Sequence, residues 1–146
     1  MRQKRFPLFI DLTGRRAVVV GGGAVGLRRA RALRRFGAEV TVIDPAPVEP
    51  AEGIELLRRA YRPGDLAGAF LAVAAANDPA VNDAVGREAR SRGVWLNRSD
   101  CPADCDFFFP ALCEGEGVVA GVAGDGSDHA RTARLAREIR AILEKE

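Results

Sequence analysis

Three glycines and one aspartate have the types and the spacing of a dinucleotide-binding site. Gly21, Gly23 and Gly26 fit the pattern G-x-G-x-x-G, and Asp44 follows 23 positions after Gly21. In such a site the first glycine permits a tight turn and the second lets backbone N–H groups approach a pyrophosphate. The third allows a helix to pack closely on a strand. A carboxylate at Asp44 can accept hydrogen bonds from both ribose hydroxyls and would repel a 2′-phosphate, so the expected cofactor is NAD rather than NADP.

The elements around these residues agree with that chemistry. An apolar, β-branched run at residues 17–20 precedes the glycines, residues 27–36 have a helical pattern, and a second apolar run at 40–43 ends at Asp44. This order is that of a βαβ unit, in which the helix N-terminus offers partial positive charge to phosphates. The alternative is a glycine turn in an α/β domain without a cofactor. That alternative gives no reason for Asp44 or for three consecutive glycines.

The alternation of strands and helices continues downstream. Short apolar runs predict strands at 54–57, 70–75 and 94–97. Between the last two, Asp78 is placed to cap a helix that begins at Pro79 and ends at Gly93. We therefore expect an α/β fold with a Rossmann-like doubly wound parallel sheet, forming an NAD-binding domain over residues 1–105. Residues 6–12 form an apolar arm that we expect to pack on this sheet.

The pattern changes after residue 105. Residues 106–112 and 117–123, joined by a turn at 114–116, predict a β-hairpin, and residues 127–145 predict a helix. That helix carries an apolar stripe of Leu135, Ile139, Ile142 and Leu143. Because a hairpin and one helix have little core of their own, we expect residues 106–146 to be a dimerisation segment, and the protein to be a homodimer.

Composition limits the class of protein. The 146 residues are 47% hydrophobic, which excludes a disordered chain. No apolar run approaches the ~18 residues of a membrane span, and the N-terminus lacks the apolar core of a secretion signal, so a cytoplasmic protein is expected. The net charge is only +2, and no aromatic residues interleave with the arginines, which argues against nucleic acid. The arginine-rich stretches 28–35 and 131–140 are either solvated helix faces or an attraction for a polyanionic small molecule.

The cysteines and the histidine give no metal site. Cys101, Cys105 and Cys113 are odd in number and lack a zinc spacing, so free thiols are expected. His129, the single histidine, is interpreted as a surface residue at a helix start, with an iron ligand or proton carrier as the alternative.

Together these residues resemble the precorrin-2 dehydrogenase/sirohydrochlorin ferrochelatase family, which forms the N-terminal part of siroheme synthases. The resemblance covers nearly the whole chain. It is carried by five motifs in order: the opening segment 6–12, the turn and helix from Gly21 to Arg31, the segment 74–82, N-x-x-D-x-P at 97–102, and F-x-x-P-A at 107–111.

The resemblance implies that hydride passes from precorrin-2 to NAD⁺ and that ring protons are lost, giving sirohydrochlorin. It implicates Asp100, the aspartate of N-x-x-D, which could act as the base just past the fifth strand. The alternative is a loop aspartate that caps a turn before Pro102. Arginine would suit the many carboxylates of this tetrapyrrole substrate. The cofactor-binding residues are expected to be Gly21, Gly23, Ala24, Val25, Gly26, Asp44, Pro45, Ala46, Ala75 and Asn77.

Two departures from the family concern iron insertion. The turn at 123–129 has Gly124 in place of a serine and His129 where proline is common, and the sequence stops at Glu146, where many members continue into a helical domain. We therefore expect dehydrogenation of precorrin-2 without efficient iron insertion. Other hypotheses remain open: a non-catalytic NAD-binding or regulatory module, a bifunctional dehydrogenase and ferrochelatase, or a chelatase that uses NAD poorly and has Cys101, Cys105 and His129 near Asp100.

Overall fold

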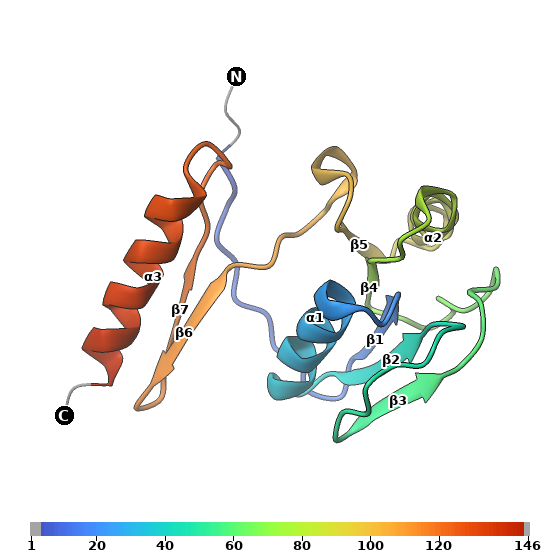
Figure 1. The fold of residues 1–146 in the computed structure, drawn as a ribbon, viewed down its shortest axis with the longest axis horizontal. Coiled ribbons are helices and arrows are strands. Elements are labelled where there is room, and N and C mark those ends of the chain that lie inside the picture. The colour runs from blue at the N-terminus through green and yellow to red at the C-terminus, as the bar shows by residue number, and fades with distance from the viewer. Residues whose placement is uncertain (1–3, 145–146) are drawn as a thin grey trace. The chain divides into compact units, whose positions relative to one another are not determined.

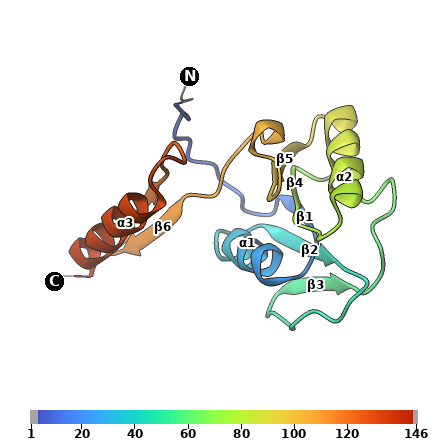
Figure 2. The ribbon, with the colours of Figure 1, turned by 45° about the horizontal axis from the view of Figure 1, so that its top comes forward.

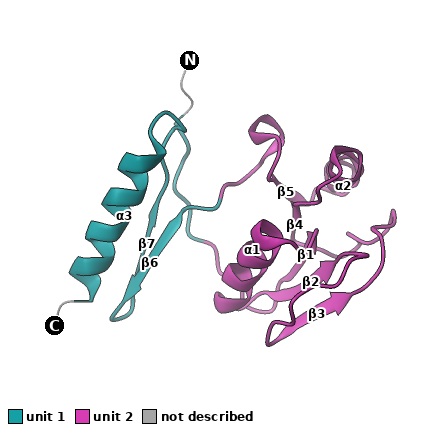
Figure 3. Ribbon diagram, viewed as in Figure 1, with its two compact units in different colours: residues 1–9, 109–146 teal, residues 10–108 magenta. Residues whose placement is uncertain are grey.

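The computed structural model describes residues 4–144 (Figure 1). These residues divide into two compact units (Figure 3). We call residues 10–108 the Rossmann unit, and residues 4–9 together with 109–144 the hairpin unit.

A five-stranded parallel sheet forms the centre of the Rossmann unit. Its spatial order is β3-β2-β1-β4-β5. The strands are β1 (Arg16–Val20), β2 (Glu39–Ile43), β3 (Ile54–Leu57), β4 (Leu71–Ala74) and β5 (Trp95–Arg98). All pairs are parallel, so the carboxyl ends of the five strands meet at one edge. The doubly wound α/β fold expected from the sequence is confirmed.

Two helices make the crossovers. Helix α1 (Ala24–Arg35) connects β1 to β2, and α2 (Pro79–Arg92) connects β4 to β5 (Figure 2). Right-handed crossovers running in opposite directions along a sheet place their helices on opposite faces. The predicted caps of α2 are confirmed: the Asp78 carboxylate accepts a hydrogen bond of 2.9 Å from the Ala80 N–H, and Gly93 ends the helix with φ of 67°. Helix α1 starts three residues earlier than expected, because Gly23 itself is its N-cap.

The core of the Rossmann unit is built from the central strands. Strand β4 is wholly buried, and β1 is buried from Ala17 onward. One cluster joins side chains of these strands to α2 and to the loop before β4, and includes Val18, Val20, Ile43, Leu66, Ala72, Val85 and Leu96. Burial on both faces explains the continuous apolar runs that mark these strands in the sequence. This packing holds the strand ends, from which the functional residues project.

The hairpin of the second unit differs from its prediction. Its strands are β6 (Ala111–Gly115) and β7 (Val118–Val122), so the prediction of a strand at 106–112 and a turn at 114–116 was wrong. A two-residue turn of type I′ needs positive φ at both residues, and Glu116 (49°) and Gly117 (78°) supply it. Asp106 instead bonds to β5: its N–H donates to the Leu96 carbonyl at 2.7 Å.

Helix α3 (His129–Leu143) packs on this hairpin, which leaves no room for a side chain at Gly115. Its cap is Asp128, which accepts a hydrogen bond of 2.9 Å from the Arg131 N–H. The buried residue of α3 is Ala136, whereas Leu135 (38%) and Ile142 (66%) of the predicted stripe are exposed. The predicted end of the helix at Lys145 lies outside the described residues.

The N-terminal arm does not pack as expected. Phe6, Leu8 and Phe9 are all exposed, and residues 4–9 belong to the hairpin unit rather than to the sheet. Over residues 4–144, none of the helices has the length and apolar character needed to cross a membrane.

Candidate functional site

The predicted site residues lie at the carboxyl edge of the parallel sheet. From β1 the chain crosses over to β2, and from β4 it crosses the other way to β5, so the connections diverge between β1 and β4. Open α/β sheets bind ligands at such a switch point. The turn after β1 and Ala75 after β4 flank it.

Two of the three motif glycines are required by packing. Gly21 has φ of 103°, and a Cβ there would lie 2.4 Å from the carbonyl oxygen of Ala75. A Cβ on Gly26 would lie 1.8 Å from the carbonyl oxygen of Gly21. The end of β1, the first turn of α1 and the end of β4 can meet only because these positions lack side chains. The structure thus brings together Gly21, Gly26 and Ala75.

Gly23 is different, because open space surrounds it. A Cβ there would meet no atom within 4 Å, and its φ is −73°. It is the N-cap of α1, which has neither a side-chain cap nor an acidic residue in its first turn, formed by Ala24, Val25 and Gly26. Nothing in the fold of this unit requires glycine at this position. Close approach of a phosphate to backbone N–H groups does require it, and the structure fits that use.

Asp44 lies against the glycine turn. Its Oδ2 accepts a hydrogen bond of 2.7 Å from the Gly22 N–H, and its Oδ1 accepts one of 2.8 Å from the Ala46 N–H. A cavity of about 180 Å³ adjoins it, with largely apolar walls from the ends of β2 and β3 and the loop between them, lined by Val42, Asp44, Ala46, Pro47, Val48, Leu56, Leu57 and Arg58. A carboxylate at the mouth of an apolar recess suits a ribose followed by an adenine ring.

Two other expected cofactor-binding residues do not line the cavity beside Asp44. Pro45 does not line this cavity, and Asn77 is exposed two residues beyond Ala75. A larger cavity, of about 520 Å³, lies toward the amino ends of β1, β2 and β3 and is lined by Gly14, Glu39 and Gly53 among others. It contains none of the predicted site residues, since these follow the carboxyl ends of the strands.

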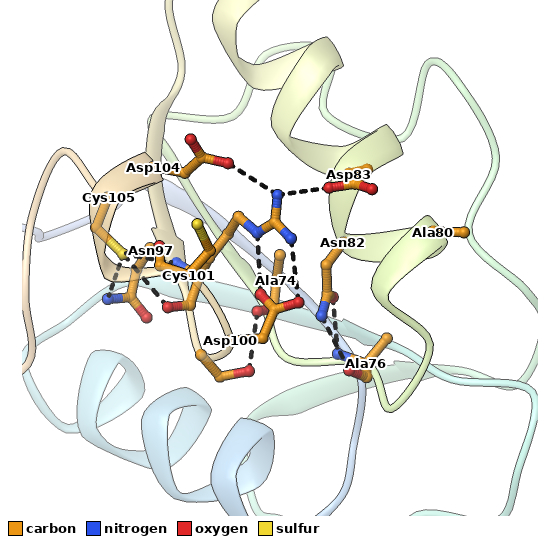
Figure 4. Close-up of polar contacts among 12 residues, drawn as sticks. Ala74, Ala76, Ala80, Asn82, Asp83, Asn97, Asp100, Cys101, Asp104 and Cys105 are labelled. Atoms are coloured by element: carbon orange, nitrogen blue, oxygen red, sulfur yellow. Dashed lines mark hydrogen bonds and ion pairs between the residues drawn. The ribbon is translucent and has the colours of Figure 1, made fainter.

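Asp100 is part of a cluster of charged side chains (Figure 4). Its two carboxylate oxygens accept hydrogen bonds from Nε and Nη2 of Arg98, at 2.9 and 3.0 Å. Nη1 of the same guanidinium donates to Asp83 at 2.8 Å and to Asp104 at 2.9 Å. Asp83 is on α2 and Asp104 ends the short 3₁₀ helix η1 (Pro102–Asp104), so one arginine joins three elements.

Arg98 and Asp100 shift each other's pKa values in opposite directions. The hydrogen bonds from Arg98 lower the pKa of Asp100; burial acts in the opposite direction, and a hydrogen bond from the Asn82 side chain lowers it further. The same bonds to Asp100, and those to Asp83, raise the pKa of Arg98 against the effect of burial. Asp100 is therefore ionised at neutral pH.

Asn82 ties this cluster to the glycine turn. It is fully buried, and its amide donates to the Ala76 carbonyl and accepts from the Ala76 N–H, both at 3.0 Å. Ala76 follows Ala75, the residue against which Gly21 packs. Asp100 and the glycine turn are thus linked through the loop after β4.

Three residues of this site lie within the sequence motifs but were not predicted to be site residues. Arg98 and Asn82 are described above; Asn97 accepts a hydrogen bond from Arg29 at 2.8 Å and donates one to the Phe107 carbonyl at 3.1 Å. A usable signal existed for Arg98, because an arginine ending a buried strand needs carboxylates. Asp83, Asp100 and Asp104 all fall near that strand end.

The thiols make structural contacts. Cys105 accepts a hydrogen bond from the Arg98 N–H at 3.1 Å, and the buried Cys113 donates one to the Ala136 carbonyl at 3.5 Å. None of Cys101, Cys105 and Cys113 forms a disulfide. Within residues 4–144, no group of three or more His, Cys, Asp or Glu side chains is arranged to hold a metal ion.

Comparison with known proteins extends this description. A protein family described as "Putative NAD(P)-binding" matches residues 8–111. The chain belongs to this family. Membership agrees with the glycine turn and Asp44, and a nicotinamide adenine dinucleotide is the cofactor of the Rossmann unit.

Relatives of this NAD(P)-binding chain include siroheme proteins. It is 43% identical over 145 residues to a siroheme synthase of Pseudomonas aeruginosa (strain LESB58), covering 94% of this chain and 30% of that protein. It is 39% identical over 145 residues to a probable multifunctional siroheme biosynthesis protein, HemA, of Ruminiclostridium josui, covering 94% of this chain and 28% of that protein. The chain spans less than a third of the length of these curated relatives.

A solved structure is also similar. The structure of SirC, a precorrin-2 dehydrogenase, matches with a TM-score of 0.78 and 26% identity, over 96% of this chain and 72% of that one. Together with the relatives, it confirms the resemblance to the precorrin-2 dehydrogenase family that the five sequence motifs indicate.

Proposed function

We propose that the chain catalyses the NAD-dependent dehydrogenation of precorrin-2 to sirohydrochlorin, a step of siroheme biosynthesis. The observation that carries this proposal is the ionised, oriented carboxylate of Asp100 at the same sheet edge as the glycine turn. A domain that only binds a dinucleotide has no need of such a group. The likeness to siroheme synthases and to a precorrin-2 dehydrogenase supports the choice of substrate.

The Rossmann unit has features that suit the pyrophosphate, one ribose and the adenine of the dinucleotide. The open space at Gly23 and the free N-terminus of α1 suit the pyrophosphate, and Asp44 suits the ribose hydroxyls. The apolar recess beside Asp44 suits the adenine. The negative charge of Asp44 favours NAD over NADP, because a 2′-phosphate there would be repelled. When bound, NAD⁺ supplies the hydride acceptor.

Asp100 takes up the ring proton in this proposal. A carboxylate whose pKa is lowered is a weak base, so it needs an acidic proton. A ring carbon next to the positive charge left by a departing hydride is such an acid. The fixed negative charge of Asp100 also favours that positive charge while it develops. The proton moves from the ring carbon to a carboxylate oxygen of Asp100.

We also propose that the protein is a homodimer through the hairpin and helix segment, residues 106–146. Val118 and Val119 of β7 and Leu135 and Ile142 of α3 are exposed apolar side chains of this segment. A second copy of the chain would cover them by a two-fold contact. Three cysteines without a disulfide fit a reducing, cytoplasmic location, which we propose as well.

The test is anaerobic incubation of the purified protein with precorrin-2 and NAD⁺. The proposal predicts protein-dependent formation of NADH and sirohydrochlorin in equal amounts, followed by absorbance. NAD binding measured calorimetrically without any oxidation of precorrin-2 would instead support a non-catalytic NAD-binding module. Sirohydrochlorin with Fe²⁺ is a separate arm, which reports iron insertion independently of dehydrogenation.

A further inference from the structure

Arg98 forms ion pairs with two further aspartates besides Asp100. The side chain of Arg98 is only 6% exposed, and all three nitrogens of its guanidinium donate to carboxylates. Figure 4 shows Asp83, Asp100 and Asp104 turned toward this one guanidinium group. The three aspartates come from α2, from the loop after β5 and from η1. The guanidinium is therefore held from several directions.

This arrangement fixes the orientation of Asp100. Two hydrogen bonds, at 2.9 and 3.0 Å, hold both of its oxygens against Nε and Nη2, in the paired arrangement that arginine favours with carboxylates. Asp83 and Asp104 share Nη1 and so keep the guanidinium from rotating with its partner. The Asp100 side chain nevertheless remains 31% exposed, so one side of the carboxylate is accessible.

The charges make the arrangement depend on Arg98. One cation faces three carboxylates, which leaves the cluster with two net negative charges. Without the guanidinium, Asp83 and Asp104 would act on Asp100 only as like charges, and its remaining hydrogen bonds would come from the neutral Asn82 side chain and from its own backbone N–H. Asp100 would then take up a proton more readily or turn toward solvent.

We propose that Arg98 is a positioning residue for this reaction: it holds Asp100 ionised and in one orientation for proton transfer from the substrate. The inference rests on the proposed function. It goes beyond the sequence motif, because N-x-x-D-x-P leaves the residue at position 98 unspecified. Arg98 does not itself touch the reacting atoms in this account.

Loss of Arg98 should change the pH at which Asp100 becomes protonated. The groups that face Asp100 are Arg98 from β5, Asn82 and Asp83 from α2, and Asp104 from η1. Removing the guanidinium deletes an attraction and leaves repulsion, so Asp100 takes up its proton at higher pH. The acidic limb of kcat/KM for precorrin-2, where the base becomes protonated, must then move to higher pH.

The kinetic test compares Arg98→Gln and Arg98→Lys with the unchanged protein. Arg98→Gln should move the acidic limb upward by about one pH unit and lower kcat about tenfold near neutral pH, with little change in NAD affinity. Arg98→Lys keeps the charge but loses the paired geometry. Compared with Arg98→Gln, it should bring the acidic limb most of the way back to its original pH but recover less of kcat. Arg92→Gln is the matched control, since it breaks an arginine–carboxylate pair with Glu88 elsewhere on α2. An unchanged limb in folded Arg98→Gln would overturn the proposal.

A second measurement does not depend on activity. The carboxyl ¹³C resonance of Asp100, assigned by its loss in Asp100→Asn, is titrated in the unchanged protein and in Arg98→Lys. The proposal predicts titration of Asp100 below the ordinary aspartate value of ~3.9 in the unchanged protein. Titration at or above that value would overturn the proposal even if Arg98→Gln fails to fold. If precorrin-2 is not oxidised at all, the proposed function fails, and this titration still decides whether Arg98 controls Asp100.

Discussion

The carboxylate of Asp44 accepts a hydrogen bond of 2.7 Å from the backbone N–H of Gly22. The acid at the end of β2 is therefore tied directly to the glycine turn at the end of β1. Its second oxygen is held by the Ala46 N–H at 2.8 Å, so both oxygens are oriented without a cofactor. The expected ribose-binding group is preorganised for its task.

Asp44 should determine the choice between the two dinucleotides. We predict that NAD⁺ binds more tightly than NADP⁺, and that Asp44→Ala narrows the difference because the repulsion of a 2′-phosphate is lost. Titration calorimetry with both cofactors measures this. Glu49→Ala, at an exposed acid in the same loop, is the control and should leave the preference unchanged. Equal affinities in the unchanged protein would remove the basis for this prediction.

Two glycines of one turn should respond to alanine in opposite ways. In Gly23→Ala the added methyl group meets no protein atom within 4 Å, so we predict unchanged stability. The affinity for NAD should fall at least about tenfold, which is a loss of ~1.4 kcal/mol of binding free energy. In Gly21→Ala the alanine would have to adopt a positive φ, and its Cβ would overlap the Ala75 carbonyl. This substitution should therefore lower the free energy of unfolding by about 2–4 kcal/mol. Urea unfolding and calorimetry separate the two effects. Normal NAD affinity in Gly23→Ala would mean that the phosphate does not lie there.

Much of this arrangement could be predicted from the sequence, and the reasons are local. The glycine turn, the caps at Asp78 and Gly93, and the buried strands each have a signature within a few residues. The hairpin register could not be predicted, because it depends on which two residues adopt positive φ, and Glu116 gives no sequence signal for this. The partners of Arg98 could not be predicted either, since Asp83 and Asp104 meet it only after β5, α2 and η1 have packed.

A carboxylate outside the site should control acid stability. Glu88 accepts hydrogen bonds from the Tyr61 hydroxyl, from the N–H groups of Gly64 (2.9 Å) and Leu66 (3.1 Å), and from Arg92. Burial raises the pKa of Glu88, but these hydrogen bonds, led by that of Tyr61, outweigh it and lower the pKa overall.

Because the folded pKa of Glu88 is below the unfolded value, its contribution to stability is complete above about pH 4.3 and is lost as pH falls through the folded pKa. Glu88→Gln should therefore reduce stability at pH 7 by about 1–3 kcal/mol and flatten the decline between about pH 5 and 3. Urea unfolding across this range measures both. The exposed Glu52, replaced by glutamine, is the control. If the stability of Glu88→Gln falls between about pH 5 and 3 as steeply as that of the unchanged protein, this assignment is contradicted.

The exposed apolar residues of α3 should hold the dimer together. We predict that the unchanged protein is a dimer at micromolar concentration, and that Leu135→Asp with Ile142→Asp makes it monomeric without unfolding the Rossmann unit. A charge buried in an apolar interface without a partner is costly. Light scattering gives the mass, and NAD binding reports on the Rossmann unit. Arg134→Ala, at an exposed position of the same helix, should leave the dimer intact. A monomeric mass for the unchanged protein would refute the dimer.

The central claim is that Asp100 takes a proton from precorrin-2 while hydride leaves to NAD⁺. The most direct measurement is single-turnover oxidation of precorrin-2 under anaerobic conditions, comparing the unchanged protein with Asp100→Asn and Asp104→Asn. Both aspartates pair with Arg98, but only Asp100 is assigned a role in the reaction. We predict that Asp100→Asn slows the oxidation by about 10²–10⁴-fold with NAD affinity nearly unchanged, and that Asp104→Asn has a small effect. Oxidation by Asp100→Asn at the normal rate would contradict the account.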